Sequence, residues 1–197
     1  MSLRRVPNIG FLPPPTDQRT HTNYMKTLNE TRETAPKMFD TENDIPKECR
    51  AQLIPLLNQR LASAVDLQMQ MEQAHWNVKG PSFIDLHKLF DELAEEVAGY
   101  VDQLAERIAQ LGGVAEGTVR MAASRTRLSE YSIEISEGMA HVGSAALALS
   151  TFGQEARDTI YETDELDDAD TADLFTEVSR GIDKWLWFVE AHSQAEK

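Results

Sequence analysis

Residues 83–111 carry the pattern that most constrains the fold. Apolar side chains recur there at steps of three and four, the spacing that gathers them into one stripe along an α-helix. The segment lies between two breaks in the chain, Gly80-Pro81 and Gly112-Gly113, so the pattern predicts a single long helix that must bury its stripe against other elements. The stripe consists of Phe83, Leu86, Phe90, Leu93, Val97, Val101, Leu104, Ile108 and Leu111.

Three further segments have the composition of long helices, at about 47–77, 136–162 and 171–192. No segment has a convincing strand pattern, and no repeat of about 20–50 residues indicates a solenoid. A chain of 197 residues is long enough for one hydrophobic core. The sequence therefore predicts an all-α fold, a four-helix bundle.

Four residues mark the expected ends and irregularities of these helices. Pro46 suits the first turn of the first helix, and Ser82 is a candidate N-cap for the second. Asp170 is expected to cap the last helix. Pro55 lies inside the first helix and is expected to bend it or to mark the start of its regular part.

Residues 1–43 differ in composition from the rest of the chain. Six of the eight prolines lie within the first 50 residues, among Thr, Asn and isolated charges with no sustained period. This composition is typical of segments that cannot bury a core. We therefore predict a flexible, Pro-rich N-terminal arm over residues 1–43 and a helical-bundle domain over residues 44–197.

The charge of the chain is strongly negative and unevenly distributed. Nineteen Lys and Arg against 33 Asp and Glu give a net charge of −14, and residues 51–197 hold 11 of the basic and 26 of the acidic side chains. An acidic surface repels nucleic-acid phosphates and attracts cations. Any contact with DNA is therefore expected to go through the arm, where residues 1–37 carry six basic and three acidic side chains.

Composition also bears on location and on metal chemistry. No apolar run approaches the roughly 20 residues of a membrane-spanning helix, and the first residues lack the apolar run of a signal peptide. We expect a cytoplasmic protein that could associate with the nucleoid, with no membrane partner. The single cysteine, Cys49, excludes an intrachain disulfide and a multi-cysteine metal site. Any metal must bind through nitrogen and oxygen.

Two pairs of candidate ligands lie on the helix predicted for 83–111. His87 and Asp91 are four residues apart, and so are Asp102 and Glu106, so each pair presents both side chains on one face. Taken singly, such pairs are most often solvated surface residues. Small residues nearby, however, favour close approach of another helix and so indicate an interface; they are Ala94, Ala98, Gly99 and Ala105.

Distance along the helix decides how the two pairs combine. Asp102 follows His87 by 15 residues, which is roughly 22 Å of helix, too far for one metal centre within a chain. If the helix packs antiparallel against the same helix of a twofold partner, the first pair of one chain meets the second pair of the other. An isologous dimer would then hold two equivalent sites, with His75 reaching each site from the preceding helix.

This set of two imidazoles and three carboxylates suits iron or manganese, with zinc as an occupant in vitro. A di-iron site inside one bundle would require two Glu-x-x-His motifs. Glu72 to His75 forms one such motif, and the sequence contains no second, because neither His141 nor His192 has Glu three residues before it. The spacing therefore favours a site between chains.

These motifs closely resemble those of the Dps family, the DNA-binding proteins from starved cells. The resemblance extends over nearly all of residues 47–192. It rests on Gln73-Ala74-His75-Trp76-Asn77-Val78-Lys79-Gly80-Pro81-Ser82-Phe83, Leu86-His87, Phe90-Asp91, Asp102-Gln103-Leu104-Ala105-Glu106-Arg107, Leu111-Gly112-Gly113, Asp170-Thr171-Ala172-Asp173 and Asp183-Lys184-Trp185-Leu186-Trp187-Phe188.

The resemblance implies a ferritin-like four-helix bundle that assembles into a hollow homododecamer built from twofold dimers. It implies di-iron ferroxidase sites at the twofold interfaces, with His75, His87 and Asp91 from one subunit and Asp102 and Glu106 from its mate, and no catalytic residue beyond these ligands. The substrates would be Fe(II) and, as preferred oxidant, hydrogen peroxide. The Fe(III) product would be stored in the cavity, and DNA would be protected from oxidative damage.

Two other functions are compatible with parts of the sequence. One is a nucleoid-associated, DNA-compacting protein whose metal sites mainly join the dimer, with DNA bound through the N-terminal arm. The other is an ordinary ferritin cage with an intrachain centre, which the missing second Glu-x-x-His motif disfavours. The arm departs from the lysine-rich tail of DNA-binding Dps proteins, because it is rich in Arg and Pro.

Overall fold

The computed structural model describes residues 36–194. Most of the predicted arm, residues 1–35, lies outside the described residues. Five helices follow in the order α2 (Lys47–Asn77), α3 (Phe83–Gln110), α4 (Val119–Arg125), α5 (Gly138–Asp164) and α6 (Ala169–Gln194). No strand occurs within residues 36–194, where a single isolated bridge joins Lys79 and Glu137. The predicted all-α, four-helix bundle is confirmed.

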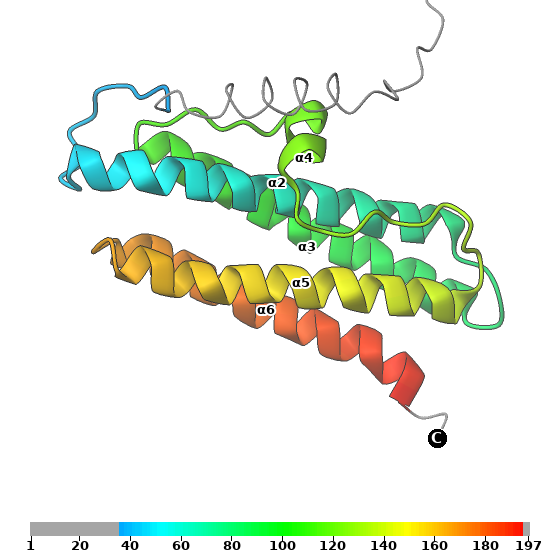
Figure 1. The fold of residues 1–197 in the computed structure, drawn as a ribbon. Helices are drawn as coiled ribbons and strands as arrows, with labels where there is room; N and C mark the ends of the chain where they lie inside the picture. The colour runs from blue at the N-terminus through cyan, green and yellow to red at the C-terminus, as the bar shows by residue number, and fades with distance from the viewer. Residues whose placement is uncertain (1–35, 195–197) are drawn as a thin grey trace, which may run out of the picture. The chain divides into compact units, whose positions relative to one another are not determined.

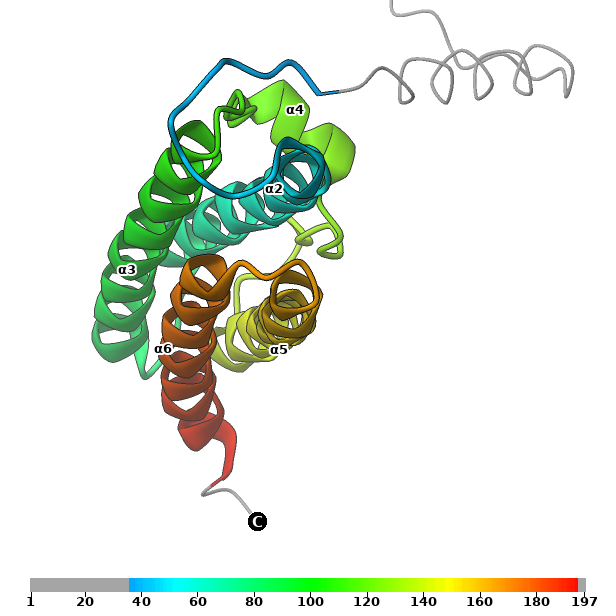
Figure 2. The ribbon, with the colours of Figure 1, turned by 90° about the vertical axis from the view of Figure 1, so that its left-hand side faces the viewer.

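The four long helices form two antiparallel pairs, α2 with α3 and α5 with α6 (Figure 1). The second view shows the four helices around a common core (Figure 2). The connection from α3 to α5 runs back along the whole bundle and contains α4 (Figure 1). A bundle with one such long crossover has ferritin-like connectivity. No helix of the described chain is long and apolar enough to cross a membrane.

The apolar stripe of α3 forms the centre of the core, as its spacing predicts. Of the nine stripe residues, seven are buried, whereas Phe83 is 44% exposed and Val101 is half-buried. Phe83 is the first residue of α3, and its ring stacks on His87 with centroids 5.1 Å apart. The buried members are Leu86, Phe90, Leu93, Val97, Leu104, Ile108 and Leu111.

The predicted bounds of α2 are confirmed at both ends, and Pro55 lies inside the continuous helix. Two predicted caps are wrong. The Ser82 side chain makes no capping hydrogen bond. At the start of α6, Asp168 rather than Asp170 accepts from the backbone N–H of Thr171, at 3.1 Å. Asp168 is buried beneath the helix start, whereas Asp170 is exposed.

A buried ion pair explains why Asp168 takes the capping position. Its carboxylate accepts a hydrogen bond from the guanidinium of Arg107 on α3, with Nη2 2.7 Å from Oδ1. Nε of the same guanidinium donates to the Thr171 hydroxyl at 2.8 Å. Asp167, the preceding residue, adopts a left-handed backbone with φ of 57°. This turn places the Asp168 carboxylate between α3 and the first turn of α6.

The last residues of the predicted arm contact the bundle at the end of α3. The backbone N–H of Phe39 donates to the carbonyl of Gly112 at 2.7 Å. Gly112 has a φ of 81°, and a Cβ there would lie 2.6 Å from the Phe39 carbonyl oxygen. The Arg50 guanidinium donates to the carbonyls of Ile45 and Leu111, both at 3.0 Å. Residues 36–46 are thus joined to the helix α3 terminus.

Candidate metal centre

His75 and His87 meet at the corner between α2 and α3. His75 lies in the last turn of α2, and His87 lies one turn into α3. The chain reverses direction between them at Gly80, whose φ is 112°. The two imidazole rings stack with centroids 3.9 Å apart and planes 18° from parallel. The helix hairpin therefore brings together two histidines that are 12 residues apart in the sequence.

Reciprocal hydrogen bonds fix the orientation of both rings. Nδ1 of His75 lies 2.8 Å from the carbonyl oxygen of His87, and Nδ1 of His87 lies 2.9 Å from the carbonyl oxygen of His75. A carbonyl oxygen only accepts, so both Nδ1 atoms carry the hydrogen. In the neutral rings both Nε2 atoms therefore keep their lone pairs, which is the tautomer that binds a metal through Nε2.

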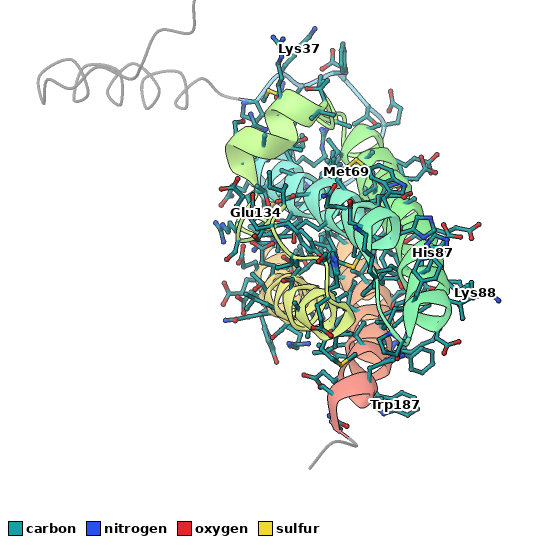
Figure 3. All side chains as sticks on the ribbon, turned by 90° about the vertical axis from the view of Figure 1, so that its right-hand side faces the viewer. Lys37, Met69, His87, Lys88, Glu134 and Trp187 are labelled. Carbon is teal, nitrogen blue, oxygen red and sulfur yellow. The ribbon has the colours of Figure 1, made fainter. Side chains whose placement is uncertain are left out.

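Asp91 joins this pair from the next turn of α3. Its Oδ1 atom lies 3.9 Å from Nε2 of His75. The Asp91 side chain is 67% exposed, whereas that of His75 is 16% exposed. Figure 3 shows His87 on the outer side of α3, beside Lys88. One chain thus supplies two stacked imidazoles and, near that of His75, one exposed carboxylate.

Asp102 and Glu106 lie on the same helix but not at this corner. Both side chains are exposed, and Asp102 follows Asp91 by 11 residues, roughly 16 Å of helix. Within residues 36–194 of one chain, no three His, Cys, Asp or Glu side chains lie close enough together to hold a metal ion. The structure therefore brings His75 and His87 together with Asp91 near His75, and keeps Asp102 and Glu106 apart from them.

Small side chains lie on the surface of α3 between the two ligand pairs. A Cβ built on Gly99 would meet nothing within 4 Å, and Ala98 and Ala105 are half-buried. Ala94 differs from the expectation, because it is 2% exposed and belongs to the core of its own chain. Ala105 also packs against the core of its own chain, so Ala98 and Gly99 remain available for the approach of another helix.

Sequence reasoning did not identify one polar pair, a half-buried tyrosine and a buried histidine. The hydroxyl of Tyr131 lies 2.6 Å from Nδ1 of His141. Tyr131 lies in the irregular connection before α5, and His141 lies in the first turn of α5. Their spacing of ten residues matches no periodic pattern, so no signal in the sequence pointed to their contact.

Comparison with known proteins places the chain in a class and then in a family. Residues 54–197 match the family model of the ferritin-like domain, so the fold is that of a ferritin-like protein. The DNA protection during starvation protein of Agrobacterium fabrum is 40% identical over 158 residues, which cover 80% of this chain and 98% of that relative. The chain belongs to the Dps family of DNA protection proteins.

Solved structures of the same family are also similar. A Dps structure from Mycobacterium smegmatis is 31% identical with a TM-score of 0.75, over 79% of this chain and 94% of that one. DpsC from Streptomyces coelicolor is 29% identical with a TM-score of 0.76, over 79% of this chain and 91% of that one. The similarity extends over most of the bundle in each case.

Proposed function

We propose that the protein is a ferroxidase and iron-storage protein that oxidises Fe(II) at sites between subunits. The observation that carries the proposal is the pair of imidazoles at the α2–α3 corner. Their Nδ1 atoms are held by the two backbone carbonyls, so both Nε2 lone pairs are available to Fe(II). Asp91 adds a carboxylate at the same corner.

In this proposal Asp102 and Glu106 of the partner subunit complete each site. The two pairs lie on one helix and are centred between residues 96 and 97, so a twofold axis there, less than one turn from Gly99, would place each pair opposite the other. The open surface at Gly99 supports this approach. The twofold dimers are proposed to build a homododecamer whose interior stores the Fe(III) product, in the cytoplasm and near the nucleoid.

The chemistry follows from holding two ferrous ions side by side. Two Fe(II) ions give two electrons to one hydrogen peroxide, which takes up two protons and leaves as two waters. Because both electrons arrive together, no hydroxyl radical is released, and DNA is protected. Few protein ligands leave room for the peroxide and for departure of the product. Zinc or manganese is expected to occupy the same ligands in vitro.

The test is Fe(II) oxidation by peroxide under anaerobic conditions, with particle mass measured on the same sample. The wild-type protein is expected to oxidise Fe(II) rapidly as a dodecamer, and His87→Ala is expected to lose this rapid phase without losing mass. Lys88→Ala is the matched control, because it is exposed and adjacent in the chain. Rapid oxidation by His87→Ala, or a wild-type monomer, would contradict the proposal.

Direct DNA contact is proposed to go through residues 1–43, because the remainder of the chain is strongly acidic. Gel retardation of plasmid DNA by the full chain and by a chain beginning at residue 44 tests this. Loss of retardation on truncation is expected. Retardation by both proteins would assign DNA binding to the bundle, and retardation by neither would leave DNA protection to iron chemistry alone.

A further inference from the structure

A tyrosine and a histidine form a short hydrogen bond where the connection before α5 packs against the bundle. The Tyr131 hydroxyl oxygen lies 2.6 Å from Nδ1 of His141, and the two rings are 25° from parallel with centroids 6.0 Å apart. His141 is 1% exposed, and Tyr131 packs half-buried against the core. A phenol and an imidazole at this distance are within range for proton transfer.

The environment of the pair determines which atom holds the proton. Burial lowers the pKa of His141, although the backbone of Asn77 and the charge of Glu137 oppose this effect. Burial also raises the pKa of Tyr131. The resting pair is therefore a neutral phenol and a neutral imidazole. Nε2 of His141 is buried with no hydrogen-bond partner in the described chain, and the Tyr131 hydroxyl has only His141 there. In the hydrogen bond that joins the two neutral side chains, the phenol O–H of Tyr131 donates to Nδ1 of His141.

The pair lies against the two helices that carry the candidate ligands. The His141 ring packs on Phe90, with centroids 6.5 Å apart and planes tilted by 58°. Phe90 precedes Asp91 in α3. The backbone of Asn77, two residues after His75, also acts on His141. Both helices that carry the proposed iron ligands thus contact the imidazole of this pair.

We propose that Tyr131 and His141 form a redox-active pair that donates one electron to strong one-electron oxidants formed at this corner. The inference rests on the proposed ferroxidase function and deepens it. A site that holds one Fe(II) instead of two reduces peroxide by one electron, giving Fe(III), hydroxide and a hydroxyl radical. An electron from Tyr131 converts that radical to hydroxide before it leaves the protein.

The electron and the proton leave Tyr131 together. The phenol loses one electron to the hydroxyl radical, and its O–H bond breaks as the proton moves to Nδ1 of His141. The products are a neutral tyrosyl radical, an imidazolium and hydroxide. A second Fe(II) then returns one electron to the phenoxyl oxygen, and Nδ1 returns the proton. The net reaction is the oxidation of one further Fe(II) by the hydroxyl radical, which becomes hydroxide.

His141 makes this step possible because it accepts the proton without leaving the core. An oxidised phenol is a far stronger acid than an imidazolium, so its proton moves to the imidazole even though burial lowers the pKa of His141. Transfer over 2.6 Å leaves the tyrosyl radical uncharged. Tyr161 on α5 offers a contrast, because it is 72% exposed and no hydrogen bond joins it to a histidine of the described chain.

The experiment is freeze-quench electron paramagnetic resonance on the full chain, with fewer Fe(II) ions than sites and an excess of hydrogen peroxide. A tyrosyl radical is expected in the wild type and in Tyr161→Phe, and its loss is expected in Tyr131→Phe. A spin trap in solution should capture more hydroxyl radical from Tyr131→Phe than from Tyr161→Phe. His141→Gln keeps Tyr131 but removes the basic acceptor, so the radical signal should fall while particle mass stays unchanged.

A second measurement does not depend on how the variants fold: oxidised tyrosines are mapped by mass spectrometry in the wild-type protein. Tyr131 is the expected site of oxidation. Fe(II) oxidation without a radical at Tyr131 would overturn the inference and leave the ferroxidase proposal intact. If the wild type oxidises no Fe(II), the ferroxidase proposal fails. Photo-oxidation of the iron-free protein by a light-excited one-electron oxidant then decides, and an equal radical yield in Tyr131→Phe and wild type would overturn the inference.

Discussion

At the scale of single residues, backbone carbonyls determine how the two corner histidines are used. The His75 carbonyl is one of the last four of α2, which lack a partner within the helix, and His87 Nδ1 donates to it. The carbonyl of His87 receives the Nδ1 hydrogen of His75. One exchange of hydrogen bonds thus satisfies a carbonyl at the end of α2 and leaves Nε2 of His75 3.9 Å from Oδ1 of Asp91.

The buried His141 leads to a prediction about pH. Burial lowers its pKa from the ordinary value of 6.5, so below that pH the unfolded chain binds a proton that the folded chain does not. The contribution of His141 to the free energy of unfolding is therefore fully present above about pH 6.5. It decreases as the pH falls below that value, by at most about 1.4 kcal/mol per pH unit. The measurement is the apparent Tm of the iron-free protein as a function of pH.

In this measurement His141→Gln should have a flatter acid side than the wild type, because glutamine does not titrate. His192→Gln serves as the control, since His192 lies in the last turn of α6 and its Nδ1 bonds within its own helix. An acid slope that is the same in wild type and His141→Gln would show that His141 is not the group responsible.

At the scale of elements, the start of α6 depends on one buried carboxylate. Asp168 accepts from the Thr171 backbone and from Arg107, so it both caps the helix and joins it to α3. Asp168→Ala should therefore lower the free energy of unfolding by about 3–5 kcal/mol, because it leaves the Arg107 charge buried without its partner. Urea unfolding followed by circular dichroism measures this change.

Asp170→Ala is the matched control for this prediction, since it removes an exposed carboxylate two residues away. Its effect is expected to stay within about 0.5 kcal/mol. Equal destabilisation by both substitutions would mean that loss of negative charge near the helix start matters more than the buried pair.

Element boundaries differ in how far local sequence predicts them. The bounds of α2 follow from Pro46 and from the Gly80-Pro81 break, both of which act through the backbone itself. The short helix α4 was not predicted, because its seven residues give too few turns for a periodic pattern. The cap of α6 was assigned to the wrong aspartate because Asp168, Asp170 and their neighbours are chemically alike.

At the scale of the whole molecule, sharing of sites between subunits predicts complementation. Take His87→Ala subunits, each of which keeps Asp102, and Asp102→Ala subunits, each of which keeps His87. In a mixed dimer one site carries both defects and the other carries none. After dissociation and random reassociation, half of the dimers are mixed, so about a quarter of the wild-type oxidation rate should return.

The measurement is Fe(II) oxidation by peroxide after the two inactive variants are unfolded and refolded together. Each variant refolded alone is the control and should stay inactive. A site formed within one chain predicts no recovery on mixing, so inactivity of the mixture at wild-type particle mass would refute the shared site.

The sequence by itself determined the elements and the types of residue that carry chemistry. The stripe of α3, the breaks at Gly80 and Gly112, and the His87–Asp91 pair all depend on residues that are close in the chain, where helix geometry relates spacing to position. The length of helix between Asp91 and Asp102 follows from the same rise per residue, and that length alone separates the two ligand pairs.

Only the tertiary structure decided what depends on contacts between distant segments. The stacking of His75 on His87, the pairing of Arg107 with Asp168 and the contact between Tyr131 and His141 join side chains from different elements. Each contact depends on how two elements pack and on the path of the loop that connects them. Local spacing does not encode these relations, because packing selects one arrangement from the many that the same periodic pattern allows.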